Sequence, residues 1–340
     1  MTRLRITRSV VAAAAAASLI ALTACGGQGA AAPSTAASTA ASNVDAQFPK
    51  TIQHAFGNTE IKTAPKRIVT LDPSYTDAAL ALGADVAGYV IYRKGDAEFP
   101  SYLGDVKAQT KDAANVGSLA EPSLDKILAA QPDLIVSAKV RHEALYPQLA
   151  KIAPTIMSVS TGPTWKQNIV MLGDALGKKD KAEQIIQAYQ ERAKKVGSAI
   201  LAKNPGLTYS YVRFAGEDTA RLYSSKSFFG EIMVDAGIPR PAGQPDSAEK
   251  IFVPLSQEQL PAAEAGLIVT SAFGQDSAEG EKSRAQKEKF MANPLWGTLK
   301  GEVLNVDDTV FATSVSLQGA HAVLTKLAEK YGVDPQLPKA

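Results

Sequence analysis

The sequence predicts an α/β protein of two lobes, each built on a central sheet, joined by a long rigid helix and separated by a ligand cleft. Residues 123–138 have the pattern of a Ser-capped helix, a Pro-Asp break and a short apolar strand, and the pattern returns at residues 256–271. Between these copies, residues 165–201 carry apolar side chains at helical spacing. The length of 340 residues also exceeds what one hydrophobic core usually serves.

The first 24 residues are predicted to be a signal peptide. Three arginines precede an apolar stretch at residues 10–22, and the chain's single cysteine, Cys25, follows closely. The Leu-Thr-Ala-Cys junction resembles the lipobox of bacterial lipoproteins, which implies lipidation of Cys25 and an anchored protein on the extracytoplasmic face of the cell membrane. An ordinary secretory signal is the alternative. Residues 25–50 are rich in small residues and are expected to form a flexible tether.

The first lobe is expected over residues 51–163, where predicted strands and helices alternate. Strand, helix and strand in this order imply a parallel sheet with right-handed crossovers. The predicted strands are residues 52–60 (with a turn), 65–71, 86–91, 134–136 and 156–159, and the helices are 75–82, 123–131 and 145–152.

A long helical connector is expected over residues 164–203, with a bend near residue 177, and the second lobe over residues 204–340. The pattern of strands and helices restarts there, while residues 275–286 are polar and are predicted to be a loop. The predicted strands are 208–214, 267–269 and 303–306, and the helices are 228–236, 256–262 and 317–331.

Cations and aromatic residues follow several predicted strands at their carboxyl ends. Ligands of open parallel sheets sit beyond these ends. Arginine donates several hydrogen bonds in a plane and stacks on rings, so this mixture suits a bulky, flat-faced anion. For each residue, a solvated surface cation is the alternative. The candidate ligand-binding residues are Tyr92, Arg93, Arg141, His142, Arg213, Arg221 and Tyr223.

Composition and motifs exclude several functional classes. The net charge of +2 argues against a nucleic-acid-binding protein. We find no Gly-rich phosphate loop, nucleophile elbow or metal-ligand cluster, so no enzyme is expected. The three histidines lie in unrelated segments, so we expect no directly coordinated metal and no resident cofactor.

Several short motifs follow one another in a specific order, at residues 65–71, 79–83, 122–136, 146–149, 152–154, 227–237 and 293–296. Their order resembles the iron-siderophore solute-binding lipoproteins of bacterial ABC importers, within the ferric siderophore and cobalamin binding-protein superfamily. The resemblance implies two Rossmann-like lobes, a ferric siderophore bound in the cleft, and a monomer that delivers it to permease subunits. It also implies that Asp125 and Glu258, one on each lobe, dock onto permease arginines; stabilising a helix N-terminus is the alternative.

The resemblance leaves the ligand open. An Arg-His pair at residues 141–142 is similar to carboxylate-siderophore binders, but catecholate and hydroxamate complexes remain alternatives. Haem or cobalamin binding within the same fold, and a cell-envelope interaction protein without a transport role, are the competing functions.

Overall fold

The structure is a computed structural model that describes residues 44–96 and 98–337. The predicted signal peptide, the lipidation site Cys25 and most of the predicted tether lie outside the described residues. The end of the tether segment belongs to the fold, contrary to expectation. Lys50 opens a strand, and its Nζ lies 2.6 Å from Asp174 Oδ1. Among the described residues, no helix is both long and apolar enough to cross a membrane.

The first lobe contains a five-stranded sheet that is parallel, as predicted, with the strand order β5-β4-β3-β6-β7; the edge strand β5 was not predicted. Alternate residues of an inner strand, at residues 134–138, enter different hydrophobic clusters: Leu134 and Val136 belong to one, and Ile135 belongs to the other. The sheet is therefore buried on both faces, which explains the continuous apolar run. The strands are β3 (Ile68–Thr70), β4 (Val86–Ile91), β5 (Ala114–Ser118), β6 (Leu134–Ala138) and β7 (Thr155–Ser158), with a hairpin of β1 (Lys50–His54) and β2 (Gly57–Ile61) beside β7.

Short helices connect these strands, and the first begins at a polar cap. The Asp72 carboxylate accepts a hydrogen bond from the Ser74 backbone N–H, which satisfies one free donor of the first turn. The helices are α2 (Pro73–Ala81), η1 (Ser101–Leu103), α3 (Lys107–Thr110), α4 (Leu124–Ala129), α5 (Lys139–His142), η2 (Glu143–Leu145) and α6 (Tyr146–Ile152).

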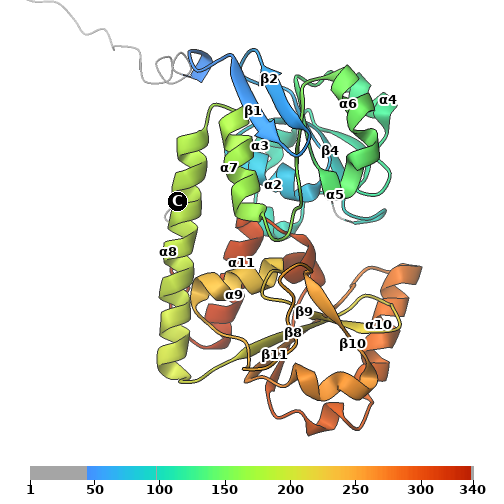
Figure 1. The fold of residues 1–340 in the computed structure, drawn as a ribbon, viewed down its shortest axis with the longest axis vertical. Coiled ribbons are helices and arrows are strands. Elements are labelled where there is room, and N and C mark those ends of the chain that lie inside the picture. The colour runs from blue at the N-terminus through green and yellow to red at the C-terminus, as the bar shows by residue number, and fades with distance from the viewer. Residues whose placement is uncertain (1–43, 97, 338–340) are drawn as a thin grey trace, which may run out of the picture.

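The segment predicted as one bent connecting helix forms two helices. α7 (Trp165–Ala175) ends before Gly177, which turns the chain at a φ of +66°, a value that favours glycine. The chain then enters α8 (Lys179–Lys203), which packs against α7. In Figure 1, α8 runs alongside both lobes, so α8 alone makes the long connection.

The second lobe contains a mixed five-stranded sheet with the order β10-β9-β8-β11-β12. β9 is antiparallel to both of its neighbours, whereas β8, β11 and β12 are parallel. The strands are β8 (Tyr209–Phe214), β9 (Ala220–Tyr223), β10 (Phe252–Leu255), β11 (Leu267–Ala272) and β12 (Glu302–Asn305). The helical elements are α9 (Phe228–Ala236), η3 (Gln257–Ala263), α10 (Ala278–Met291), η4 (Trp296–Thr298), η5 (Thr309–Thr313) and α11 (Leu317–Lys330).

The repeat predicted from the sequence is present with one difference. Ser123 caps α4 through its side chain, and Ser256 forms a capping box with Gln259 at the start of η3. η3 is a 3₁₀ helix, and Pro261 lies inside it. In an α-helix the proline ring would clash with the carbonyl four residues earlier, so Pro261 disfavours an α-helix in the second copy.

Two segments that lie outside the predicted strands and helices contain regular structure. Residues 278–291 form α10, which begins where the Ser277 side chain accepts a hydrogen bond from Gly280 N. The stretch at 220–223 forms β9, an inner strand of the second sheet. The polar composition of α10 hid its helical character, because helix formation there depends on capping and on burial of a few side chains such as Phe290.

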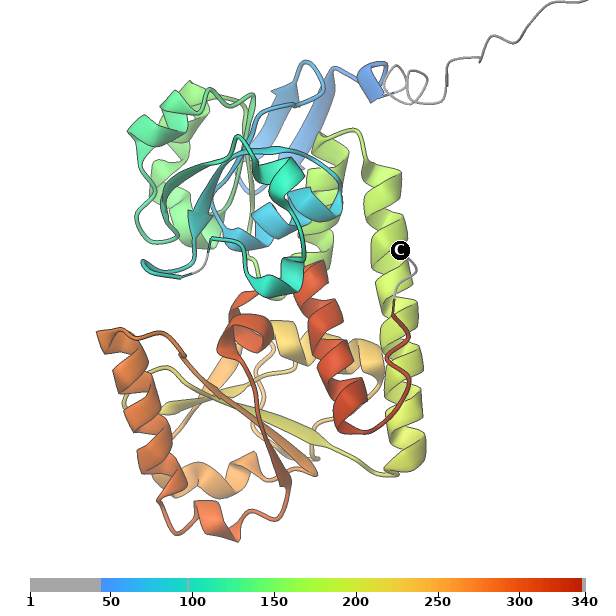
Figure 2. The same cartoon turned by 180° about the vertical axis from the view of Figure 1, so that it is seen from behind.

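The two lobes contact each other directly near α8. Figure 2 shows α11 lying beside α8 and reaching the first lobe, where Gln318 Nε2 donates to the Asp77 carbonyl oxygen of α2 at 2.8 Å. A second contact between the lobes is an ion pair, in which Lys166 Nζ of α7 lies 2.7 Å from Asp235 Oδ2 of α9. These contacts and a hydrophobic cluster shared by both lobes join the lobes beside α8.

Candidate functional site

A cavity of about 470 Å³ lies between the lobes and is lined by residues from both. Most of them follow the carboxyl ends of parallel strands, which is where ligands of such sheets are expected. Its lining residues are Tyr92, Arg93, Arg141, Arg213, Ala215, Gly216, Arg221, Phe273, Glu279 and Lys282. We call this cavity the basic compartment.

Two arginines of the basic compartment come from the first lobe. Arg93 follows β4, and Arg141 lies in α5 directly after β6. Arg141 Nε donates to Asp72 Oδ2 at 3.1 Å, while Asp72 Oδ1 accepts from the Ser74 backbone and hydroxyl. The residue that caps α2 therefore also fixes the guanidinium of Arg141, which lines the cavity.

Two more arginines lie side by side on neighbouring strands of the second sheet. Arg213 on β8 and Arg221 on β9 are direct cross-strand partners. Like charges in this position repel, so counter-charges are needed. Asp308 supplies one, because Arg213 Nε and Nη2 donate to its two carboxylate oxygens at 2.6 and 2.7 Å. Glu217 supplies the other through a two-bond ion pair with Arg221.

Arg213 stays charged although its side chain is only 4% exposed. Burial acts to lower the pKa of Arg213, but Tyr223 and Asp308 outweigh burial, and the net shift is upward. The paired, hydrogen-bonded geometry is what makes a buried charge tolerable here.

The Phe273 ring contacts one arginine from each lobe. Its ring centroid lies 3.8 Å from Arg93 Cζ and 4.9 Å from Arg213 Cζ, so arginines of different lobes stack on one ring. Arg93 also stacks on Tyr92 at 4.7 Å. Stacking orients a guanidinium without using its hydrogen-bond donors. The N–H donors of Arg93 are therefore not used by the rings, whereas Arg213 already donates to Asp308 and Tyr223.

Cations outnumber anions on the wall of the basic compartment. The cationic lining residues are Arg93, Arg141, Arg213, Arg221 and Lys282, whereas the one carboxylate in the lining is Glu279. The other counter-charges, Asp72, Asp308 and Glu217, pair with arginines of the wall but are not part of the lining. The arrangement can hold a compact, multiply charged anion by several charge-assisted hydrogen bonds.

The structure brings five of the seven predicted ligand-binding residues to this wall and leaves two behind it. His142 is buried, its Nδ1 lies 2.7 Å from Ser137 Oγ and its Nε2 2.8 Å from the Leu119 carbonyl oxygen. Burial lowers the pKa of His142. The Tyr223 hydroxyl accepts from Arg213 Nη1 at 2.9 Å. His142 and Tyr223 therefore do not line this cavity, and both support it from the protein interior.

Two charged lining residues were not among the predicted ligand-binding residues. Glu279 and Lys282 belong to α10, which was predicted to be a loop. The sequence does contain a signal for the start of this helix: Ser277 can cap it, and Glu279 and Glu281 supply acidic residues in the first turn.

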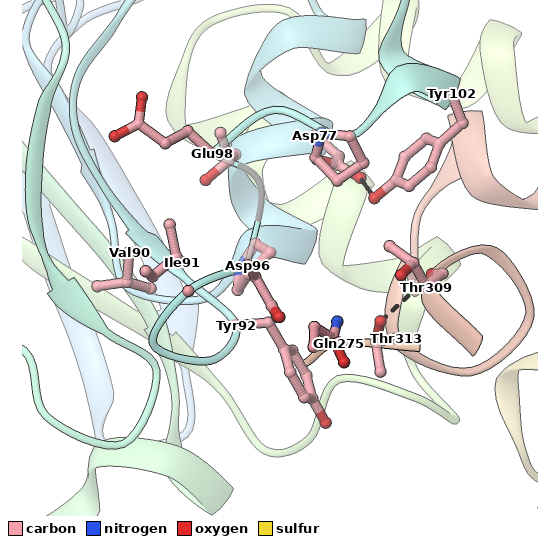
Figure 3. A pocket seen from close by; sticks show the side chains of 14 residues that line it. Asp77, Val90, Ile91, Tyr92, Asp96, Glu98, Tyr102, Gln275, Thr309 and Thr313 are labelled. Atoms are coloured by element: carbon pink, nitrogen blue, oxygen red, sulfur yellow. Dashed lines mark hydrogen bonds between the residues drawn. The ribbon is translucent and has the colours of Figure 1, made fainter. Parts of the chain in front are cut away.

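A second cavity of about 190 Å³ adjoins the first at Tyr92 and is acidic (Figure 3). Its wall includes Asp77, Asp96 and Glu98 of the first lobe, and Gln275, Thr309 and Thr313 of the second. The Tyr102 hydroxyl donates to Asp77 Oδ2 at 2.8 Å, as Figure 3 shows. Burial raises the pKa of the Asp77 carboxyl to about 7.

The two predicted docking acids are exposed on separate lobes. Asp125 lies in the first turn of α4 and Glu258 in the first turn of η3. Hydrogen bonds from its own backbone and from the Ser256 hydroxyl lower the pKa of Glu258. Within residues 44–96 and 98–337, no group of three or more His, Cys, Asp or Glu side chains is placed to hold a metal ion.

Comparison with known proteins agrees with this architecture. The chain is 33% identical to "Probable siderophore-binding lipoprotein YfiY" of Bacillus subtilis over 83% of this chain and 88% of the relative. It is 27% identical to the Fe(3+) dicitrate-binding periplasmic protein FecB of Escherichia coli over 78% and 84% of the two chains.

A solved structure, SirA of Staphylococcus aureus complexed with staphyloferrin B, matches with a TM-score of 0.76 and 29% identity. The match covers 84% of this chain and all of SirA. The family model described as "Periplasmic binding protein" matches residues 68–300, which span both lobes. The resemblance seen in the sequence is thus confirmed, and the chain belongs to the periplasmic binding protein family of substrate-binding proteins.

Proposed function

We propose that this protein is the substrate-binding lipoprotein of an ABC importer. It captures an anionic ferric siderophore in the basic compartment and delivers it to the membrane permease. The observation that carries the proposal is the convergence of four arginines, two from each lobe, on one cavity. The names of its relatives, which include siderophore-binding and ferric dicitrate-binding proteins, support the same cargo class.

The chemistry of the wall favours a chelate with negatively charged arms. Each guanidinium is already oriented by a carboxylate or a ring, so little side-chain entropy is lost on binding. Carboxylate oxygens suit the planar donor fork of arginine. The relative named for ferric dicitrate makes carboxylate chelates the first class to test. Iron arrives as cargo already held by the chelator.

Delivery would use one acid on each lobe. Asp125 and Glu258 are exposed, and each stands at the start of a helix on a different lobe. Cationic permease residues at a matching spacing would contact the acids of both lobes at the same time. Lipidation at Cys25 would hold the protein, as a monomer, on the extracytoplasmic membrane face. Reversing each charge, Asp125→Lys and Glu258→Lys, should abolish uptake in cells while leaving ligand binding in solution unchanged.

Ligand titration tests the binding step directly. Quenching of tryptophan fluorescence is measured with ferric citrate, ferric catecholate and hydroxamate siderophores, haem and cobalamin. Arg141→Ala and Arg221→Ala should each weaken binding of the anionic ferric chelate by about tenfold to a hundredfold, because each removes charge-assisted hydrogen bonds. Lys111→Ala is the matched control, since it removes a cation whose side chain is 73% exposed and does not line the cavity.

The outcomes separate the competing functions. Binding of haem or cobalamin alone, unaffected by the arginine substitutions, would favour that alternative. No response to any member of the panel would contradict a transport role and favour a cell-envelope interaction protein.

A further inference from the structure

Glu279 occupies an unusual place among the carboxylates that accompany the cleft arginines. It lies in the first turn of α10 in the second lobe, and its Oε2 is 3.5 Å from Arg93 Nε in the first lobe. Among the residues that the structure describes, it is the single acidic residue in the lining of the basic compartment. The ion pair therefore crosses the cleft at the position where an anionic ligand would meet Arg93.

The other counter-charges are held in place by more contacts. Asp72 and Asp308 are each 5% exposed and accept further hydrogen bonds from Ser74 and Ser271. They are parts of the wall that a ligand cannot displace without leaving buried charges unpaired.

Glu217 and Glu279 are the more exposed carboxylates, and they differ in what they join. Glu217 makes two bonds to Arg221 within its own lobe. The Glu279 side chain is 70% exposed, and the ion pair with Arg93 is its one polar contact found within residues 44–96 and 98–337. Glu279 can swing into solvent at little cost, and Arg93 keeps its stacking on Phe273 when it does.

We infer that Glu279 is a displaceable placeholder: it occupies the anion position on Arg93 while the cleft is empty and yields it to the ligand's carboxylate. This inference rests on the proposed function and identifies a residue that sets affinity. A ligand must outcompete an internal carboxylate, so weakly anionic chelates are disfavoured relative to multiply charged ones.

The competition is modest because the pair is exposed. Ion pairs of this kind are weak, so removing the internal competitor should tighten ligand binding by about two- to fivefold at low salt. The gain should shrink as salt rises, since screening weakens both the ion pair and the ligand's attraction to the site.

The test compares Glu279→Gln with Glu281→Gln. Both residues lie in the first turn of α10, both are exposed, and only Glu279 lines the cavity. Each substitution removes one negative charge and one favourable helix-terminus interaction, so long-range and helix effects are matched. Ferric citrate is titrated calorimetrically into wild type and both variants at low and high salt. We expect tighter binding for Glu279→Gln alone.

Three results would count against the inference. Equal affinities of wild type and Glu279→Gln would overturn the placeholder role while leaving the proposed function standing. Weaker binding by Glu279→Gln would show that the carboxylate contacts the ligand instead of competing with it. Absence of binding to wild type, for ferric citrate and for every other ferric chelate of the panel, would overturn the proposed function and the inference together.

Discussion

The buried carboxyl of Asp77 makes the stability of this protein depend on pH, and Asp77→Asn should remove that dependence. Asp77 is 2% exposed on α2, where its side chain accepts from Tyr102 and its backbone carbonyl accepts from Gln318 of the second lobe. Burial, reinforced by the nearby charge of Asp72, raises its pKa from 3.8 to about 7, although hydrogen bonds from Ser316 and Tyr102 act in the opposite direction.

The sign follows from where the proton is bound. Between about pH 4 and pH 7 the folded protein holds the Asp77 proton while the unfolded chain has released it. The stabilising contribution is therefore complete below about pH 4 and is lost as pH rises to about 7. A shift of about 3 pKa units corresponds to on the order of 4 kcal/mol across this window.

Asparagine keeps the shape and an oxygen acceptor for Tyr102 but never ionises. Asp77→Asn should match wild type near pH 4 and exceed its free energy of unfolding at pH 8 by up to that amount. Urea denaturation at a series of pH values measures the difference, and Asp112→Asn, at a side chain that is 78% exposed, is the control. Parallel pH profiles for wild type and Asp77→Asn, or a less stable variant at pH 8, would refute the linkage.

Three further predictions concern the cleft and the lobe contacts. Asp308→Asn should lower the free energy of unfolding by about 3–5 kcal/mol, because it leaves Arg213 buried without its counter-charge; Glu217→Gln, at a more exposed pair, should cost about 1 kcal/mol or less. Gly197→Ala should lower the melting temperature, because its Cβ would lie 1.8 Å from the Ala236 carbonyl oxygen, whereas Gly297→Ala meets nothing within 4 Å and should not. The affinity for an anionic ferric chelate, followed by fluorescence titration, should fall as ionic strength rises; no salt dependence would exclude arginine-dominated binding.

The success of the fold prediction has a local physical basis. The strand at residues 86–91 and the helix at residues 228–236 were predicted with the bounds that the structure has, because an apolar run and a Ser cap with a terminal glycine are signals contained in the element itself. The short strand β9 and the polar helix α10 were missed, because β9 depends on pairing with β8 and α10 on a cap that few apolar residues follow.

The candidate site was predicted less completely than the fold. Tyr92, Arg93 and Arg141 were found because they directly follow strands whose carboxyl ends must meet. His142 is the next residue after Arg141, yet its ring points inward to Ser137. Adjacent residues of a helical turn face different directions, so proximity in the sequence could not separate a lining residue from a supporting one.

The sequence alone determined that the chain makes two sheet-based lobes, repeats a capped helix and strand, and presents cations and rings at the strand ends. Periodicity, capping and strand-end placement are local properties, so they can be read from neighbouring residues. The tertiary structure alone decided which cations share a cavity and which carboxylates accompany them. Asp72 is 69 residues from Arg141 and Asp308 is 95 from Arg213, and only packing of distant segments brings such charges into contact.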